Sequence, residues 1–202
     1  MNTRELIMEK ALVLFNRDGV MQTSTRDIAD ACGISQGNLT YHFRQKNDLI
    51  AALFFSLKDK SDQIISGISE NGFDMKNFIN SIHAQFSVMY EYRFLFLDFL
   101  NILREVKTLK KEYAVLNQKR RLQFHEFLDL MNEGGYLNCR LSPEIKDSLY
   151  RMYSIYFNFW LTDAEILESG RKDKIIREYV NSAMLLLRPY LNDRANAVFF
   201  RP

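Results

Sequence analysis

Residues that interrupt helices are scarce in this sequence: 8 of its 202 residues are glycine and 3 are proline, and one of the prolines, Pro202, is the last residue. Between the breaks, apolar side chains recur three and four positions apart, which places them on one face of a helix. Ile7, Ala11 and Phe15 follow this spacing, and Gly19 comes after them at a position typical of a helix C-cap. The sequence therefore predicts an all-α fold.

Glycines mark the expected ends of the later helices, and they stand at positions 67, 72, 134, 135 and 170. The candidate helices between these breaks are 47–68, 75–91, 94–107, 110–132, 143–168 and 172–191. Ser142, Pro143 and Glu144 are typical of an N-cap, a first-turn proline and an acid favoured by the helix dipole. We expect long helices joined by short connections.

Composition narrows the class of protein. Hydrophobic residues make up 47% of the chain and charged residues 26%, as in a folded globular protein. The longest stretch without Asp, Glu, Lys or Arg is 77–90, whereas a membrane-spanning helix needs about 20 apolar residues, so we expect no membrane partner. Charges at the N-terminus argue against a signal peptide, and Cys32 and Cys139 form neither a disulfide framework nor a metal cluster. We expect a cytoplasmic protein.

Residues 24–43 carry the most specific local pattern. Ser24 and Asp27 have the spacing of a capping box at the start of a short helix. Gly33 stands where the chain can reverse, and Ser35 can cap a second short helix. Two short helices joined by a tight turn are typical of a helix-turn-helix, whose second helix enters the major groove of DNA with its N-terminus first.

The second of these helices has a polar face suited to DNA. Leu39 and Phe43 occupy its apolar side, and the remaining side chains are small or form hydrogen bonds. Gln36 and Asn38 can pair with base edges, and the methyl group of Thr40 can meet a thymine methyl. The pattern therefore predicts a recognition helix.

Other groups near this helix suit the DNA backbone. Gly37 allows a close approach to the duplex. The side chains with the chemistry for phosphate contacts, which position a protein without reading sequence, are Arg26, Tyr41, His42 and Lys46. Residues 1–50 hold six Lys or Arg and six Asp or Glu, a net charge of zero. Affinity must therefore come from a few well-placed cations, helix N-terminal amides and a second copy of the domain.

At these residues the sequence resembles a known family. The stretch from Leu6 to Leu53 resembles the N-terminal domain of TetR-family transcriptional regulators. The matching elements are the stripe Ala11-x-x-Leu14-Phe15 with Gly19, the run TSTRDIADACGIS, and Gly37-x-Leu39-x-x-His42-Phe43-x-x-Lys46. One departure is Thr40, where the family usually has tyrosine. The phosphate contact of that tyrosine is then either missing or supplied by Tyr41.

The resemblance implies an N-terminal three-helix DNA-binding domain over 1–50 and a larger helical domain for effector binding and dimerisation over 51–202. Together with the groups above, it gives as DNA-binding residues Thr25, Arg26, Ser35, Gln36, Gly37, Asn38, Thr40, Tyr41, His42 and Lys46. It also implies a homodimer on palindromic double-stranded DNA, acting as a repressor, with its interface on the helices 143–168 and 172–191. Two such copies bind half-sites about 34–36 Å apart, or multiples of that.

Aromatic residues and methionines are dense beyond residue 51. Core packing accounts for most of them, although such a domain can also enclose an apolar pocket with tyrosine hydroxyls that orient a ligand. The candidate effector-binding residues are Phe86, Met89, Tyr90, Phe99, Tyr153, Phe157 and Trp160. We expect a small apolar or amphipathic effector that favours a conformer whose recognition helices no longer match the operator.

No catalytic constellation accompanies these features. The chain has no Walker loop and no dinucleotide-binding glycine pattern, and the pair His125-Glu126 lacks the second histidine of a zinc-protease motif. We expect no enzyme activity, no catalytic residues, no cofactor and no metal site. Two alternatives stay open: a constitutive DNA-binding regulator or adaptor without an effector and, more remotely, an enzyme on a helical scaffold.

Residues 104–121 form a basic segment with seven Lys or Arg and two Glu, a net charge of +5. Such a run is usually a solvated helix face. It can also attract an anionic ligand or the phosphates that flank a DNA site.

Overall fold

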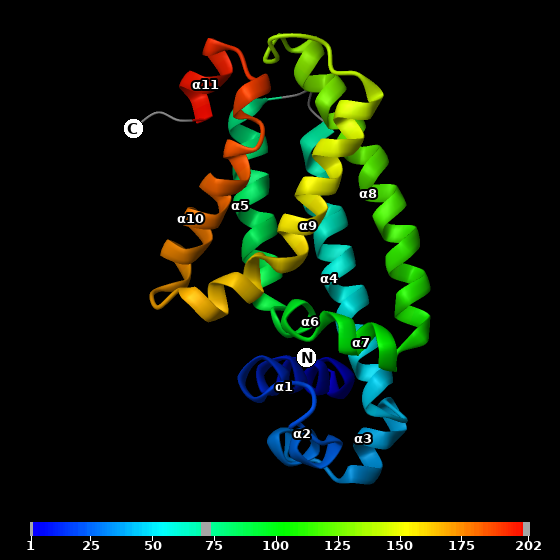
Figure 1. Ribbon diagram of the computed structural model, residues 1–202. Coiled ribbons are helices and arrows are strands. Elements are labelled where there is room, and N and C mark those ends of the chain that lie inside the picture. The colour runs from blue at the N-terminus through cyan, green and yellow to red at the C-terminus, as the bar shows by residue number, and fades with distance from the viewer. Residues whose placement is uncertain (1, 70–73, 200–202) are drawn as a thin grey trace. The chain divides into compact units, whose positions relative to one another are not determined.

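The computed structural model describes residues 2–69 and 74–199, which form eleven α-helices and one short 3-10 helix (Figure 1). In these two stretches there is no β-strand, and one isolated antiparallel bridge joins Leu137 to Leu191. The prediction of an all-α fold is confirmed.

Contacts divide the chain into two compact units. The first unit holds the chain up to Lys60 together with Met89–Lys111, and the second holds Ser61–Val88 together with the chain from Glu112 onward. The helices that contribute residues to both units are α4 (Lys46–Ser69), α5 (Met75–Glu91) and α8 (Lys107–Glu133).

The first unit is centred on α1. Its complete helices are α1 (Thr3–Asp18), α2 (Thr25–Cys32), α3 (Gln36–His42), α6 (Phe94–Leu97) and α7 (Phe99–Glu105). Ile7, Ala11 and Phe15 are buried on one face of α1, as the apolar spacing predicted. The ring of Phe15 packs against that of Phe94 in α6, with the ring centroids 5.1 Å apart.

One side chain of α1 joins the unit's two distant segments. The amide nitrogen of Asn16 donates to the backbone carbonyl of Glu91 (2.7 Å), and its amide oxygen accepts from the backbone N–H of Phe94 (3.1 Å). The Arg93 guanidinium donates to the Asn16 carbonyl (3.2 Å). Residues 89–111 are therefore held to the N-terminal helices by hydrogen bonds as well as by ring packing.

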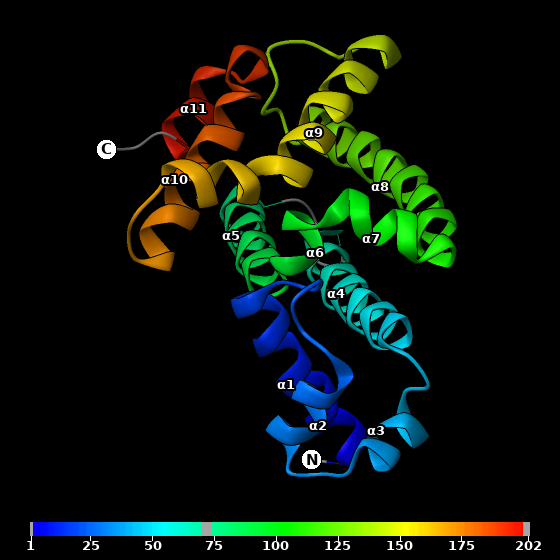
Figure 2. The same cartoon turned by 60° about the horizontal axis from the view of Figure 1, so that its bottom comes forward.

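The second unit surrounds an aromatic cluster. Its complete helices are α9 (Pro143–Leu167), α10 (Lys172–Leu185) and α11 (Asp193–Phe199), and parts of α4, α5 and α8 join them (Figure 2). Phe86 of α5 is fully buried, and its ring centroid lies 5.1 Å from that of Phe157 and 4.9 Å from that of Trp160. Because large aromatic side chains bury much area, this cluster makes a major contribution to the unit's core.

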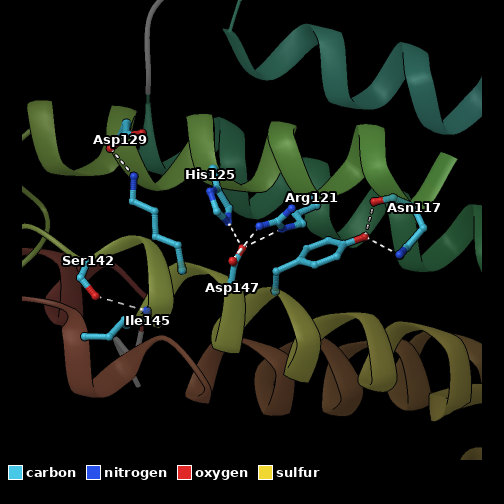
Figure 3. A network of polar contacts seen from close by, with 9 residues as sticks. Asn117, Arg121, His125, Asp129, Ser142, Ile145 and Asp147 are labelled. Atoms are coloured by element: carbon cyan, nitrogen blue, oxygen red, sulfur yellow. Dashed lines mark hydrogen bonds and ion pairs between the residues drawn. The ribbon is translucent and has the colours of Figure 1, made fainter. Parts of the chain in front are cut away.

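A row of polar contacts, the polar seam, joins α8 to α9 (Figure 3). Its paired residues are Asn117 with Tyr150, Arg121 and His125 with Asp147, and Asp129 with Lys146. Two nitrogens of Arg121 donate to the two carboxylate oxygens of Asp147, at 2.7 and 2.6 Å. These hydrogen bonds hold the pKa of Asp147 below its ordinary value.

The helix α9 also carries apolar side chains that a single chain leaves exposed. Ile155 and Phe159 are 58% and 47% exposed. The exposed large apolar positions of α9 are Ile145, Met152, Ile155, Phe159, Ile166 and Leu167, and we call the first five the α9 stripe. Four of the five lie seven residues apart, and Ile155 lies between two of them, which is the heptad spacing of helices that pack against each other.

The helix predicted over 172–191 is shorter than expected. In the structure α10 ends at Leu185, and a 3-10 helix over Arg188–Tyr190 follows. Pro189 explains the difference, because proline lacks the N–H that would bond the Leu185 carbonyl. The structure also adds α11, which the sequence analysis did not predict.

The prediction of a single helix over 94–107 is wrong. It is interrupted at Asp98, whose φ of −113° and ψ of 21° depart from helical values, and the result is α6 and α7. The carboxylate of Asp98 accepts a hydrogen bond from the Asn101 side chain (2.9 Å). Aspartate often makes such local bonds, which compete with a continuous helix.

Glycine breaks were predicted with mixed success. Gly67 lies inside α4 and does not end it, since one glycine costs a helix only about 1 kcal/mol relative to alanine. Gly72 lies outside the described residues. The breaks at Gly134-Gly135 and Gly170 are confirmed, because α8 ends just before the first and the second lies between α9 and α10.

Candidate nucleic-acid interface

The helix-turn-helix is fixed by the capping groups that the sequence predicted. The Ser24 hydroxyl accepts from the Asp27 N–H (3.2 Å), and the Asp27 carboxylate accepts from the Ser24 N–H (2.8 Å). Hydrogen bonds from Ser24 keep the pKa of Asp27 below its ordinary value. Gly33 has a φ of +66°, the left-handed conformation that favours glycine, and Ser35 accepts from the Asn38 N–H (3.2 Å).

These caps present α3 with its polar face outward. Leu39 is only 1% exposed, and Phe43 is also buried. The predicted DNA-binding residues that are exposed are Arg26, Ser35, Gln36, Gly37, Asn38, Thr40 and Tyr41. The others, which are half-buried, are Thr25, His42 and Lys46.

The side chains predicted to read bases differ in how many hydrogen bonds they already make within the protein. The amide nitrogen of Gln36 donates to the Thr25 hydroxyl (2.9 Å), so this contact links the starts of α2 and α3. The Thr40 hydroxyl donates to the Gln36 carbonyl (2.9 Å), which leaves the Thr40 methyl group for a contact. The Asn38 amide makes no hydrogen bond to any residue that the structure describes. Asn38 is therefore the side chain most available to a base.

Lys46 has a role that its spacing did not reveal. Its ammonium group donates to the backbone carbonyls of Val20 (2.8 Å) and Thr23 (3.1 Å). Thr23 in turn donates its hydroxyl to the Gly19 carbonyl (2.9 Å). Lys46 thus ties the loop between α1 and α2 to the first turn of α4.

The sequence analysis missed two cations beside α3. Arg44 lies two residues beyond the end of α3, is exposed, and pairs with no described residue. The guanidinium carbon of Arg4 lies 4.9 Å from the ring centroid of Phe43, which places a positive charge at the end of α3. Arg44 could have been found from the sequence, because it is a cation immediately beyond the predicted recognition helix.

The candidate effector-binding residues fall into two groups. Phe86, Tyr153, Phe157 and Trp160 come together in the second unit. The Tyr153 hydroxyl donates to the Ala183 carbonyl (2.8 Å), and burial raises the pKa of Tyr153. The remaining candidates belong to the first unit and are Met89, Tyr90 and Phe99.

Among the described residues, no three His, Cys, Asp or Glu side chains come together as a metal would require. None of the helices in that part of the chain is both long and apolar enough to cross a membrane.

The fold and this exposed helix define a helix-turn-helix protein with a second helical unit. Residues 7–53 match the model of bacterial regulatory proteins of the tetR family, and residues 57–199 match the TetR model described as a bacterial transcriptional repressor. The chain therefore belongs to the TetR family of bacterial transcriptional regulators. These are non-enzymatic DNA-binding proteins, so the prediction that the chain is not an enzyme is confirmed.

Individual relatives agree with this assignment. The HTH-type transcriptional regulator AcrR of Shigella flexneri is 29% identical over 188 residues, which cover 90% of this chain and 76% of AcrR. A TetR-family transcriptional regulator from Marinobacter aquaeolei VT8 has a similar fold, with a TM-score of 0.90, 20% identity, and coverage of 98% of this chain and 96% of that one. The SmeT–triclosan complex has a TM-score of 0.65 and 17% identity over 99% of this chain and 95% of SmeT.

Proposed function

We propose that this regulator binds a palindromic DNA operator as a homodimer, represses transcription there, and responds to a small apolar or amphipathic effector. The observation that carries the proposal is the exposed polar face of α3, held outward by the capped ends of two short helices. The proposed DNA-binding domain spans 1–50, and the proposed effector-binding and dimerisation domain spans 51–202. A DNA partner implies a cytoplasmic location.

Selection of bound sequences from a random DNA pool tests the proposal directly. We expect a palindromic consensus with half-sites separated by about one or more helical turns, roughly 34–36 Å each. A consensus without twofold symmetry contradicts the dimer, and the absence of any enriched sequence contradicts specific DNA binding.

Asn38 is proposed to read a base edge, because its amide is exposed and unbonded within the described chain. We expect Asn38→Ala to relax sequence preference at one position of each half-site, where a good bidentate contact discriminates by about 1–3 kcal/mol. Binding measured on single-base operator variants checks this. Gln118→Ala, which removes another exposed amide, should keep the wild-type preference. Equal losses of affinity for operator and random DNA would contradict the proposal that Asn38 reads a base.

Tyr41 is proposed to donate to a phosphate, since its side chain is 85% exposed on α3. Tyr41→Phe should weaken binding to all DNA sequences by at least about tenfold, because a hydrogen bond to a charged group is worth about 1.5–3 kcal/mol. The melting temperature should not change, since an exposed hydroxyl is lost. Anisotropy titrations with operator and random duplexes measure the effect; a loss confined to the operator would argue for base reading instead.

Dimerisation is proposed through α9 and α10, and the α9 stripe supports it. An exposed apolar stripe with heptad spacing suits packing against the same stripe of a second copy. Two helices from each copy would then form a four-helix bundle with twofold symmetry, matching the symmetry of a palindromic operator.

Effector binding is proposed within the larger domain, at residues that include Phe86, Tyr153, Phe157 and Trp160. The similar SmeT has been solved with triclosan, which supports a small aromatic effector here. A thermal-shift screen of apolar aromatic compounds tests this, because a ligand that binds the folded state raises the melting temperature. A binding compound should also release operator DNA. If none of a broad panel shifts the melting temperature, constitutive binding is the better account.

A further inference from the structure

The basic segment 104–121 divides into two parts with different surroundings. The cations of its later part are paired inside the second unit: Lys119 and Arg120 with Asp62, at 3.0 and 2.6 Å, and Arg121 with Asp147, at 2.6 Å. These three charges hold α8 to α4 and to α9. They are therefore accounted for by the fold.

The cations of the earlier part have no such partners. They lie at the end of α7 and the start of α8, and we call them the α7–α8 patch: Arg104, Lys107, Lys110 and Lys111. All four are exposed, and none is paired with a described residue. The three lysines share one face of α8, because they are spaced at i, i+3 and i+4. Leu109, on another face, is fully buried in the first unit and fixes their orientation.

The patch is not neutralised by neighbouring acids. Glu105 and Glu112 are exposed and form no ion pair with it in the described structure. The first turn of α8 contains no acidic residue, although the helix dipole favours acids and disfavours cations there. No acid among the described residues pairs with these four cations, and the phosphates of a polyanion from outside the chain have the charge to do so.

The position of the patch suggests which polyanion this is. It belongs to the same compact unit as α3. Residues 1–50 have no net charge, whereas 89–111 bring five Lys or Arg and three Asp or Glu to the unit. The helix-turn-helix is thus supplemented by cations from a distant part of the chain.

From these observations we infer that the α7–α8 patch binds backbone phosphates of DNA that flanks the half-site read by α3. This inference rests on the proposed function. Lysines without hydrogen-bonding neighbours act as point charges, so the contact is independent of the flanking sequence. The patch lengthens the operator footprint and increases the salt dependence of binding.

The test compares two duplexes: the selected operator without flanks, and the same operator with ten base pairs of arbitrary sequence on each side. For the wild type, we expect the flanks to tighten binding by at least about tenfold at low salt and to steepen the slope of log K against log salt, by about 0.9 per added phosphate contact. The variant Lys107→Gln/Lys110→Gln/Lys111→Gln should lose this gain and keep its affinity for the short duplex.

Two control variants separate charge from folding. Lys107→Arg/Lys110→Arg/Lys111→Arg keeps the charges and should keep the gain. Lys76→Gln/Arg140→Gln/Arg194→Gln removes three exposed charges of the second unit that lie outside α9 and α10, and it should also keep the gain. A wild type that gains nothing from flanks, or a glutamine variant that keeps the gain, overturns the inference. Failure of the wild type to bind the selected operator at all would instead contradict the proposed function.

Discussion

Replacing Ile155 and Phe159 by glutamate is expected to give a folded monomer that binds operator at least about 100-fold more weakly, because linking two binding domains raises avidity by about 10²–10⁴. Both side chains are about half exposed in the single chain, so each copy tolerates the change. In the proposed dimer they meet the same stripe of the partner, where a buried unpaired carboxylate is strongly unfavourable. Analytical ultracentrifugation and operator titrations measure the two effects.

A matched control uses another exposed apolar pair of the same unit. Val115 and Leu122 on α8 are 66% and 61% exposed. The variant Val115→Glu/Leu122→Glu should remain dimeric and bind operator as the wild type does. If the α9 variant still sediments as a dimer, the interface lies elsewhere on the molecule.

Lys46→Met should lower both the stability of the protein and its affinity for every DNA sequence. Methionine keeps the apolar stem but removes the ammonium group that bonds the Val20 and Thr23 carbonyls. Hydrogen bonds from a charged group are worth about 1.5–3 kcal/mol, so we expect a lower melting temperature and at least about tenfold weaker binding. The reason is loss of the tie between α4 and the loop that precedes α2.

The variant Arg44→Gln is the control for Lys46→Met, because Arg44 is exposed and pairs with no described residue. It should weaken DNA binding without changing the melting temperature. Differential scanning calorimetry beside anisotropy titrations separates the two cases. An unchanged melting temperature for Lys46→Met would show that its hydrogen bonds add nothing to stability.

Local features of the helix-turn-helix were predictable, because their causes lie within a few residues. The capping bonds of Ser24 and Ser35 join groups three residues apart, and the left-handed Gly33 needs no distant partner. The burial of Leu39 likewise follows from helical periodicity. These features place a polar helix face at the surface from sequence alone.

Contacts between distant residues were not predictable in the same way. Lys46 bonds a loop that is 23 to 26 residues earlier, and Asn16 bonds Glu91 and Phe94, more than 70 residues later. No spacing rule specifies such pairs, since they depend on how complete helices pack. For the same reason, the sequence showed that 104–121 is basic and left open which charges are neutralised.

The density of aromatic residues in the sequence did not predict which of the effector-binding candidates lie together. Of the seven candidates, the structure brings together Tyr153, Phe157 and Trp160 of α9 with Phe86 of α5. The same criterion also selected Met89 and Phe99, which belong to the other compact unit. Proximity along the chain does not determine the unit in which a side chain packs.

The exposed side of α9 has a consequence for the stability of the newly made protein. In the proposed dimer, the α9 stripe would be covered only after two copies have met. The melting temperature would then rise with protein concentration, because dilution favours the separated copies. A cell with few copies of the proposed dimer would hold a regulator that is both less assembled and more easily unfolded.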